Sequence, residues 1–454
     1  MRKYFGTDGI RRIANTELSP ELVYRVAKAG AYVLSKHTDK APTILIGRDT
    51  RISGTLIESA MVAGFLSYGA NVKLLGVMPT PAVAYLTRKL QADASVVISA
   101  SHNTYEFNGI KYFSNKGMKI SDEIEEEIEE VMDSGKLDEL SAVKEKIGLS
   151  EIRTDLLDEY VYFFRKNFDD NIEKYNNPNF KVVIDTANGA TYEVADKVFS
   201  TLGINHVIIN NNPDGININH NCGSTHLDML KEYVIKNKMS LGIAYDGDGD
   251  RCLAIDENGE EIDGDKLLAI ISNYLKSKGK LAKDTIVATV MSNLGLNKYA
   301  EKNNMRLLQT KVGDRYVLEE MLKNGYNLGG EQSGHVILLD YNPTGDGILT
   351  SLMLIQAMLE SGKTASQLGN LVQKYPQVLI NAKVSSDKKN DYEKNPEIKN
   401  AIAELEKEFS GNGRVLIRPS GTEPLVRVMI EGKNKNEIEE KARKIANLIE
   451  KNCK

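Results

Sequence analysis

The sequence predicts an α/β protein with three similar α/β domains, whose sheets are mixed but mostly parallel, followed by a smaller C-terminal α+β domain. Three observations support this prediction. A chain of 454 residues, 41% of them hydrophobic, is too long for one ordinary core. Three segments share a plan of apolar strand, short polar loop and helix. After Gln367 the pattern changes to strands accompanied by two longer helices.

Each of the three βα units begins with an apolar strand and continues into an amphipathic helix. The first is TILIG, the loop RDTRISG with Ser53 as the expected N-cap, and a helix with an apolar face of Leu56, Ile57, Ala60, Met61, Gly64, Phe65 and Tyr68. The second is KVVID, TANGAT and a helix carrying Val194, Ala195, Val198, Phe199 and Leu202. The third is TIVATV, MSNLG and a short helix with Leu296, Tyr299 and Ala300. Ligand groups in such units collect at the carboxyl ends of the strands.

The C-terminal segment has a different order of elements. We expect a strand near Val378 to Val384, a charged helix near Glu397 to Phe409, the strands RVLI and LVRVMI, and a last helix with one apolar face. Charged connecting sequence runs from about Asp133 to Asp155, and Glu257 to Asp263 is expected to be a turn opening the third unit. The predicted domains are therefore 1–150, 151–255, 256–368 and 369–454.

Composition excludes several classes of function. The net charge of -5, from 58 basic and 63 acidic side chains spread along the chain, provides no field that would attract nucleic acid. Cys222, Cys252 and Cys453 lack metal-ligand spacing and are typical of a reducing compartment. The start MRKYFGTDGIRR has charged residues where a secretory signal is apolar, and no later apolar run reaches membrane-spanning length. We expect a cytoplasmic protein that binds neither nucleic acid nor membranes.

The motif DGDGDR, from Asp246 to Arg251, is the strongest local signal for chemistry. It follows the apolar strand LGIAY, and its alternating aspartates and glycines can turn three carboxylates toward one hard cation. An EF-hand loop is a poor match, because Arg251 occupies the sixth position, where that loop needs glycine. We expect Asp246, Asp248 and Asp250 to bind Mg²⁺.

Two further loops point to phosphate chemistry. SASHN follows the buried-looking run ASVVI, so Ser101 should emerge at a strand end, where it can act as a nucleophile or phosphoryl carrier. Its neighbour His102 is not placed as its base by adjacency alone. RPSGTEP lies between two strands, where Ser420, Gly421 and Thr422 can present donors to a phosphate while Arg418 pairs with it, reinforced by Arg427. A simple hairpin turn is the alternative for that loop.

GEQSGH and GTDGIR are polar loops suited to sugar hydroxyls and to a phosphoryl group, respectively. The combination of a serine, three aspartates, a phosphate cradle and a sugar-type loop resembles the α-D-phosphohexomutase superfamily. Within it, the closest resemblance is to the bacterial phosphoglucosamine mutases, and it covers essentially the whole chain. The motifs that carry the resemblance are FGTDGIR, SASHN, NGIKYF, CGSTH, DGDGDR, VGDRYVLEEM, GGEQSGH, TGDGILT and RPSGTEPLVRVM. Two positions depart from the family pattern: Thr104 stands where proline is usual, and Arg12 where glycine is usual.

The resemblance implies roles for individual residues around a central active-site cleft. Ser101 is a phosphoserine that also contacts the magnesium ion, and it exchanges its phosphoryl group with the sugar through a bisphosphorylated intermediate. Lys111 is the implied general base, with His335 as the competing proton handler. Arg11, His102 and Arg251 complete the catalytic set, and Glu331, Ser333 and His335 contact the sugar. Closure by a hinge near the last linker is also expected.

The implied activity is interconversion of glucosamine 6-phosphate and glucosamine 1-phosphate, for amino-sugar nucleotide and cell-wall precursor synthesis. A hexose or hexosamine 1,6-bisphosphate would activate the enzyme, and a homodimer is implied. A phosphomannomutase or phosphoglucomutase is the leading alternative, and Gln332 of the sugar loop is the feature that separates it. A serine-dependent sugar phosphatase and a noncatalytic sugar-phosphate sensor are the more distant alternatives.

Overall fold

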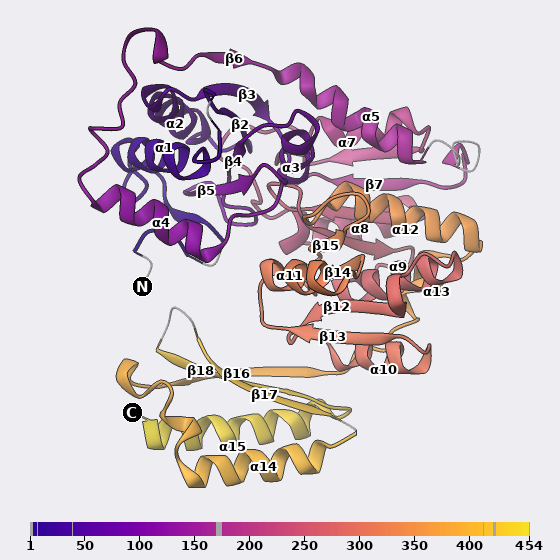
Figure 1. The fold of residues 1–454 in the computed structure, drawn as a ribbon. Coiled ribbons are helices and arrows are strands. Elements are labelled where there is room, and N and C mark those ends of the chain that lie inside the picture. Colours follow the sequence, from indigo (N-terminus) through magenta and orange to yellow (C-terminus); the bar gives the residue numbers. More distant parts are fainter. Residues whose placement is uncertain are drawn as a thin grey trace. The chain divides into compact units, whose positions relative to one another are not determined.

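The computed structural model describes residues 3–6, 8–38, 40–168, 175–411, 413–420 and 424–453. The chain forms two compact units. The first comprises Met1–Met291 and Leu308–Leu371, and the second comprises Ser292–Leu307 and Val372–Lys454. The elements of each are labelled in Figure 1.

The first sheet has six strands in the order β1-β5-β4-β2-β3-β6. Their bounds are Ile10–Ile13 for β1, Thr43–Arg48 for β2, Asn71–Val77 for β3, Ala94–Ile98 for β4, Phe107–Ser114 for β5 and Ser150–Ile152 for β6. Strands β4, β2, β3 and β6 are parallel, whereas β5 and β1 are antiparallel to their neighbours. The sheet is thus mixed, and its edge strand β6 comes from the charged connection after Asp133, where the sequence analysis placed no strand.

Helices cover both faces of this sheet (Figure 1). They are α1 (Pro20–Leu34), α2 (Gly54–Tyr68), α3 (Thr80–Lys89) and α4 (Asp122–Asp133). Residues of α1, α2 and α4 share one apolar core with β2, β3 and β4. On α2 the predicted spacing turns Ile57, Met61 and Phe65 into this core. Leu56, which was expected on the same face, is 40% exposed, so that part of the prediction is wrong. The predicted N-cap Ser53 does stand at the start of α2, but its Oγ accepts a hydrogen bond from Asn108 Nδ2 (2.9 Å) instead of capping the helix.

The second sheet has five strands in the order β11-β10-β9-β7-β8. They are β7 (Val182–Asp185), β8 (His206–Ile209), β9 (Leu241–Tyr245), β10 (Cys252–Asp256) and β11 (Glu261–Ile262), with helices α5 (Leu157–Phe168), α7 (Val194–Thr201) and α8 (Asp228–Asn237). Strands β9, β7 and β8 are parallel, and β10 returns antiparallel to β9. The DGDGDR motif is the loop of that return. Residues 257–260 turn the chain from β10 into β11. The segment expected to be a turn opening the third unit, Glu257 to Asp263, thus contains an edge strand of the second sheet, which short length and distant pairing hid from the sequence analysis.

The third sheet has four strands in the order β13-β12-β14-β15. The strands are β12 (Thr285–Thr289), β13 (Arg306–Thr310), β14 (Leu328–Gly330) and β15 (Val336–Leu338), and the helices are α9 (Gly264–Ser277), α11 (Asp314–Asn324), α12 (Gly347–Ser361) and α13 (Ala365–Gly369). Strands β14 and β15 are antiparallel, so the GEQSGH loop between them is a hairpin. Helix α12 is buried along most of its length, because its apolar side chains are distributed all round the helix instead of along one face.

The second compact unit contains an antiparallel sheet in the order β16-β18-β17. Its elements are α10 (Leu294–Lys302), β16 (Gln377–Lys383), α14 (Pro396–Phe409), β17 (Arg414–Pro419), β18 (Leu425–Glu431) and α15 (Lys435–Cys453). The core includes the predicted stripe of the last helix, from Ile438 to Ile449. Buried Glu431 accepts hydrogen bonds from Asn293 Nδ2 (2.9 Å) and the Leu294 amide (3.2 Å) and pairs with Arg414 (2.9 Å), which ties the start of α10 to this sheet.

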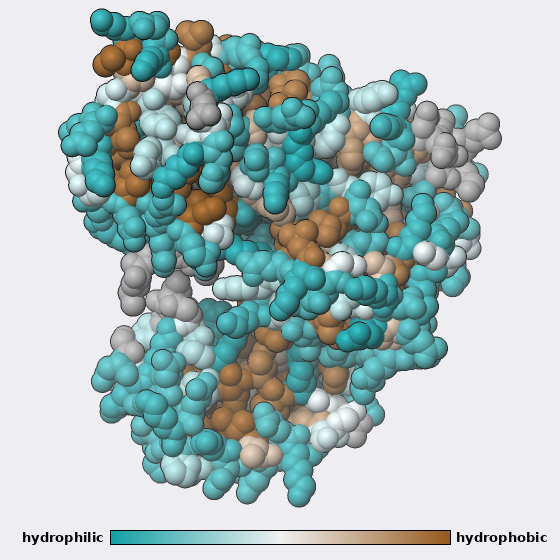
Figure 2. Space-filling model, in the orientation of Figure 1, coloured by the Kyte–Doolittle hydropathy of each residue, from teal (hydrophilic) through white to brown (hydrophobic). Residues whose placement is uncertain are grey.

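Three-residue 3₁₀ turns complete the described structure at Lys144–Lys146, Thr154–Leu156, Gly223–Thr225, Ala282–Asp284, Ser386–Lys388 and Asp391–Glu393. Within the described residues, no helix has both the length and the apolar character needed to cross a membrane. Figure 2 shows hydrophilic side chains over most of the visible face, with apolar side chains in separate patches.

Phe65 is expected to be a major anchor of the first core. It lies on α2, is fully buried and packs edge-on against Tyr112 of β5 with ring centroids 6.5 Å apart. Phe65→Ala should lower the free energy of unfolding by about 3–5 kcal/mol, because the cavity left behind adds to the lost apolar burial. Leu56→Ala on the same helix, where the side chain is 40% exposed, is the control and should cost about 1 kcal/mol or less. Denaturant unfolding of both variants measures this, and equal losses would contradict the assigned core.

Candidate active site

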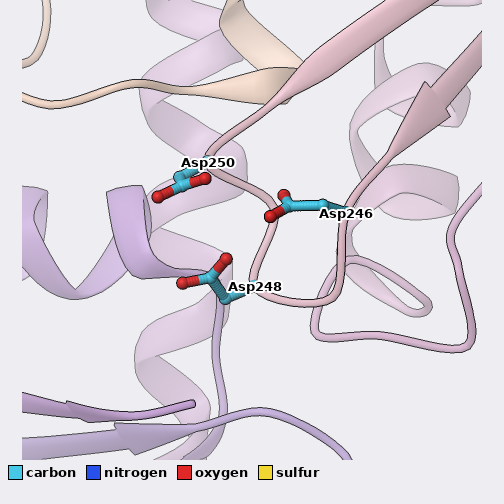
Figure 3. Close-up of side chains that lie close together, drawn as sticks. All are labelled: Asp246, Asp248 and Asp250. Atoms are coloured by element: carbon cyan, nitrogen blue, oxygen red, sulfur yellow. The ribbon is translucent and has the colours of Figure 1, made fainter. Parts of the chain in front are cut away.

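Three buried carboxylates meet in the loop between β9 and β10. Each of Asp246, Asp248 and Asp250 has a carboxylate oxygen within 4.8 Å of the others, and Figure 3 shows the three side chains pointing into a common space. Oδ1 of Asp248 and Oδ1 of Asp250 have no hydrogen-bond partner within the described part of the chain. Buried carboxylate oxygens without partners are costly unless a cation or donor satisfies them. The predicted aspartates therefore fit a hard divalent cation bound through oxygen ligands.

Burial and charge repulsion within this cluster act on the pKa values of its carboxyl groups. Burial raises the pKa of Asp246 well above its ordinary value, and the neighbouring charges of Asp250 and Asp248 raise it further. Burial acts in the same direction on Asp250, but the charges of His335 and Lys111 bring its pKa below the ordinary range. The loop thus concentrates negative charge that needs positive partners.

Ser101 lies against the aspartates. It follows β4, it is 1% exposed, and its Oγ donates a hydrogen bond of 2.6 Å to Asp246 Oδ2. His102 Nδ1 lies 3.4 Å from the same Oγ. Burial, reinforced by the positive charges of Arg251 and Arg11, lowers the pKa of His102 to about 4. His102 is therefore neutral near pH 7 and places no positive charge beside the serine.

Lys111 reaches the cluster from the middle of β5. Its Nζ lies 2.9 Å from Asp248 Oδ2 and 3.3 Å from Asp8 Oδ2. Burial lowers the pKa of Lys111, but the charges of Asp248 and Asp8 outweigh burial and raise the pKa above its ordinary value. With the carboxylates free, Lys111 is therefore a cation, whereas a lysine that acts as a base needs a lowered pKa.

His335 is the last residue of the GEQSGH loop, directly before β15, and its ring lies beside Asp250. Its Nδ1 is 3.5 Å from Asp250 Oδ2, and its Nε2 accepts a hydrogen bond from the Gly345 amide (3.0 Å). That bond requires a lone pair on Nε2, so the neutral ring carries its proton on Nδ1. Burial lowers the pKa of His335, but the negative charges of Asp250 and Asp314 outweigh burial and raise this pKa above its ordinary value. A second proton would sit on Nε2 and would break the hydrogen bond from the Gly345 amide. The geometry of that bond therefore assigns the neutral ring with its proton on Nδ1.

The remaining predicted residues of the first unit surround this centre. Arg251 bridges to His335 in an isolated β-bridge, and its amide donates to Asp246 Oδ1 (3.1 Å). Arg11 donates to Asn103 Oδ1 (3.2 Å) beside the serine loop. In the sugar-type loop, Glu331 accepts from the Gly313 amide (3.2 Å). That loop and the serine loop are therefore parts of one compact unit.

Two polar side chains of the sugar-type loop, Ser333 and Gln332, differ in whether they have a hydrogen-bond partner. Ser333 Oγ is buried and has no hydrogen-bond partner in the described ranges, which leaves it free for a ligand. The side-chain amide nitrogen of Gln332, Nε2, donates to Asp265 Oδ2 (3.1 Å) at the start of α9. Gln332, the residue expected to separate an amino-sugar site from others, thus helps to hold the loop.

The predicted phosphate cradle belongs to the second compact unit. Arg418 of β17 and Arg427 of β18 are cross-strand partners. Burial, together with the charge of Arg427, lowers the pKa of Arg418, as expected where two guanidinium groups lie side by side. Ser420 is buried at the end of β17. The predicted residues Gly421 and Thr422 lie outside the described residues.

Sequence motifs did not single out several charged residues of the site. Lys119 lies between Asp8 and Asp314, with a distance of 2.7 Å to Asp314 Oδ2. Asp8 and Asp314 stand within the quoted motifs GTDGIR and VGDRYVLEEM, so their motif membership was an available signal. Lys119 lies outside those motifs, and only the folding together of the first and third sheets places it here.

Arg51 and Asn219 were also missed. Both are buried, and both donate hydrogen bonds to the backbone of the serine loop. Arg51 belongs to the RDTRISG loop, which the sequence analysis used only to define a βα unit. Asn219 lies in an asparagine-rich loop that resembles an ordinary polar turn.

Models of protein families match the chain in four consecutive segments. They describe the α/β/α domains I, II and III of phosphoglucomutase/phosphomannomutase, at residues 2–139, 158–259 and 263–375, and the C-terminal domain of the same proteins at residues 379–448. The chain belongs to the phosphoglucomutase/phosphomannomutase family. The expected architecture of three α/β domains and a C-terminal domain is thereby confirmed.

Relatives within this family are similar over their whole length. The phosphoglucosamine mutase of Clostridium acetobutylicum is 53% identical over 451 residues, which cover 99% of each chain. That of Clostridium perfringens is 52% identical over 453 residues, covering 100% of each. The predicted resemblance to phosphoglucosamine mutases is thus confirmed.

Solved structures agree on the fold. A phosphoglucomutase/phosphomannomutase family protein from Burkholderia thailandensis superposes with a TM-score of 0.80 at 21% identity, covering 100% of this chain and 99% of that one. The N-acetylphosphoglucosamine mutase of Aspergillus fumigatus, solved in complex with GlcNAc-6P and magnesium, superposes with a TM-score of 0.67 at 17% identity, covering 100% and 96%.

Removing one carboxylate charge from the cluster should weaken metal binding. Asp248→Asn is expected to lower the affinity for Mg²⁺ by at least about tenfold, because a neutral amide replaces an anionic oxygen ligand. Asp256→Asn is the matched control, since Asp256 is also buried and lies at the end of the next strand, but its Oδ1 only accepts from the amides of a turn. Calorimetric titration with MgCl₂ measures both, and unchanged affinity in Asp248→Asn would remove that residue from the site.

Proposed function

We propose that this protein is a phosphoglucosamine mutase that interconverts glucosamine 6-phosphate and glucosamine 1-phosphate through a phosphorylated Ser101. The single observation that supports this most is the buried Ser101 Oγ, 2.6 Å from Asp246 in a cluster of three carboxylates. The full-length similarity to phosphoglucosamine mutases directs the proposal to an amino sugar. A hexose or hexosamine 1,6-bisphosphate is proposed to install the first phosphoryl group.

The proposed reaction consists of two balanced phosphoryl transfers. In the first, a sugar oxygen forms a bond to phosphorus while the bond from phosphorus to Ser101 Oγ breaks; the attacking sugar hydroxyl loses its proton to a base, and the leaving Ser101 oxygen takes up a proton to become a hydroxyl. The product is a 1,6-bisphosphorylated sugar. After this intermediate turns over, the Ser101 hydroxyl loses its proton as its oxygen attacks the other phosphoryl group, the bond from that phosphorus to the sugar oxygen breaks, and the sugar oxygen takes up a proton. Asp246, Asp248 and Asp250 would hold Mg²⁺, which would supply positive charge to phosphoryl oxygens.

The cationic side chains around Ser101 are suited to stabilise the transferring group. Arg11 of β1 donates to Asn103 of the serine loop, Arg251 ends the aspartate loop, and Lys111 lies beside Asp248. Phosphoryl transfer depends mainly on positioning and on neutralising charge. We propose Lys111 as the group that exchanges the sugar proton, on the condition that a cation bound to the aspartates offsets the carboxylate charge that otherwise raises its pKa. His335, whose Nδ1 faces Asp250, is the alternative.

Substrate binding is proposed to use two groups of residues. Glu331, Ser333 and His335 would hold the sugar; the support is that Ser333 Oγ is buried and without a partner among the described residues. Arg418, Ser420, Gly421, Thr422 and Arg427 would hold the nonreacting phosphate. The cross-strand pairing of Arg418 with Arg427 supports an anion site, because two arginines at paired strand positions can both donate to one phosphate.

Ser101→Ala should abolish conversion of glucosamine 6-phosphate, because no other residue is proposed to carry the phosphoryl group. The variant should fold, since alanine removes one hydroxyl from a loop and the expected stability change is about 1 kcal/mol. The measurement is chromatographic quantification of glucosamine 1-phosphate after priming with glucose 1,6-bisphosphate. Ser59→Ala, in an exposed serine of α2, is the control. Retained turnover in Ser101→Ala would disprove the carrier.

The same assay separates the mutase from a phosphatase that uses the same serine. A mutase should release far less than one inorganic phosphate for each substrate molecule converted, because the phosphoryl group returns to the sugar. A phosphatase releases one inorganic phosphate for every substrate molecule consumed. A colorimetric phosphate assay on the wild-type reaction measures this ratio. Stoichiometric phosphate release would replace the proposed mutase by a phosphatase.

A further inference from the structure

The backbone at Ser101 is in an unusual conformation. Its φ is 50°, in the left-handed region that a residue with a Cβ adopts rarely. Such a conformation costs free energy and persists only when surrounding contacts determine it. In this conformation Oγ points at Asp246. The contacts that hold the backbone therefore decide where the serine oxygen points.

The buried guanidinium of Arg51 provides most of the contacts that hold the backbone of this loop. Its side chain is fully buried, and its guanidinium donates through Nη2 to the carbonyls of Ser101 (3.0 Å) and Asn103 (2.8 Å). Through Nη1 it donates to the carbonyls of Phe107 (3.0 Å) and Thr104. One planar fork thus satisfies four carbonyls of the segment that follows β4.

Asp49 and Ser99 orient this guanidinium relative to the serine. Arg51 Nε donates to Asp49 Oδ2 (2.8 Å), and Ser99 Oγ donates to the same oxygen (2.5 Å). Ser99 Oγ in turn accepts from the Ser101 amide (2.9 Å). Both the amide and the carbonyl of Ser101 are therefore tied to one buried ion pair.

Asn219 holds the same carbonyls from the second sheet's loops. Its Nδ2 donates to the carbonyls of Ser101 and Asn103, at 2.8 Å each. Gly247 leaves the room for this contact, because a Cβ there would lie 2.5 Å from the Ser101 carbonyl oxygen and 2.7 Å from Asn219 Nδ2. The serine loop thus accepts hydrogen bonds from Arg51, which follows β2 of the first sheet, and from Asn219, which lies in a loop of the second sheet.

We propose that Arg51 and Asn219 are positioning residues that keep Ser101 Oγ aimed at the aspartate cluster in both halves of the reaction. This inference rests on the proposed role of Ser101 as the phosphoryl carrier. The serine must give up a phosphoryl group and later accept another in the same geometry, so its loop has to stay in place while the oxygen is bare. A loop that relaxes from φ 50° would turn Oγ away from its partners and slow both transfers.

The first test replaces Asn219 with glycine. Asn219 has a φ of 58°, so glycine removes the two hydrogen bonds without backbone strain. Asn221→Gly is the matched control, because Asn221 has a φ of 54° in the same loop but an exposed side chain, whose Nδ2 lies 3.3 Å from His220 Nε2 and away from the serine loop's carbonyls. The Asn219 variant should lose at least about tenfold in kcat with KM within about twofold, because misplacing reacting atoms costs rate. The control should match wild type.

The second test is Arg51→Lys, which keeps the charge beside Asp49 but lacks the fork that reaches four carbonyls. Arg48→Lys, in the same loop and paired with Glu58, is its control. Enzyme primed with ³²P-labelled glucose 1,6-bisphosphate is mixed with glucosamine 6-phosphate in a quench-flow apparatus. The rate of label transfer per labelled serine should fall at least about tenfold in Arg51→Lys and Asn219→Gly, while thermal unfolding identifies any variant that fails to fold.

Two outcomes would overturn the positioning role. A normal transfer rate per labelled serine, with only fewer molecules labelled, would mean that the two residues support folding alone. Rates that equal those of the control variants would mean that the loop holds without them. Failure of the wild-type enzyme to label Ser101 would instead disprove the carrier proposed above, and it is distinguished because it precedes any comparison of variants.

Discussion

Three buried carboxylates in one short loop are the constraint on which the site depends. Asp246, Asp248 and Asp250 cannot remain buried without positive partners and hydrogen-bond donors. The donors within the first unit come from separate elements: the Ser101 hydroxyl after β4, Lys111 on β5 and His335 before β15. Because each contacts the same loop, satisfying the aspartates brings the strand ends of three sheets to one place. The chemistry proposed for Ser101 follows from that convergence.

Local patterns predicted most of the elements, because helix and strand periodicity is written into neighbouring residues. The three βα units, the C-terminal strands and the last helix appear where expected. Features that depend on distant pairing did not appear in the sequence. Strand β6 is fully exposed and pairs with β3 at the edge of the sheet, so no apolar alternation marks it. Helix α10 groups with the C-terminal unit through buried Glu431, although it follows a strand of the third sheet directly.

The motifs singled out Ser101, the three aspartates, Lys111 and His335, because each motif keeps its chemistry within a few residues, and the structure places these side chains close together. The sequence analysis missed residues that contact other parts of the site instead of carrying a motif. Arg51 and Asn219 donate hydrogen bonds to backbone carbonyls of the serine loop. Lys119 forms ion pairs with the carboxylates of Asp8 and Asp314. Such contacts leave no spacing pattern. The roles given to the individual residues, the hinge and the homodimer stay predictions, and Gly421 and Thr422 lie outside the described residues.

The proposed function requires the Ser101 centre to isomerise an amino-sugar phosphate. Phosphorus NMR of the magnesium-loaded protein, primed with a hexose bisphosphate, measures this reaction when glucosamine 6-phosphate and glucose 6-phosphate are supplied in separate tubes. The 1-phosphate resonance of the amino sugar is expected to grow quickly and that of glucose much more slowly. Equal or faster conversion of glucose would contradict the assigned substrate, and the absence of any 1-phosphate from either sugar would contradict the mutase itself.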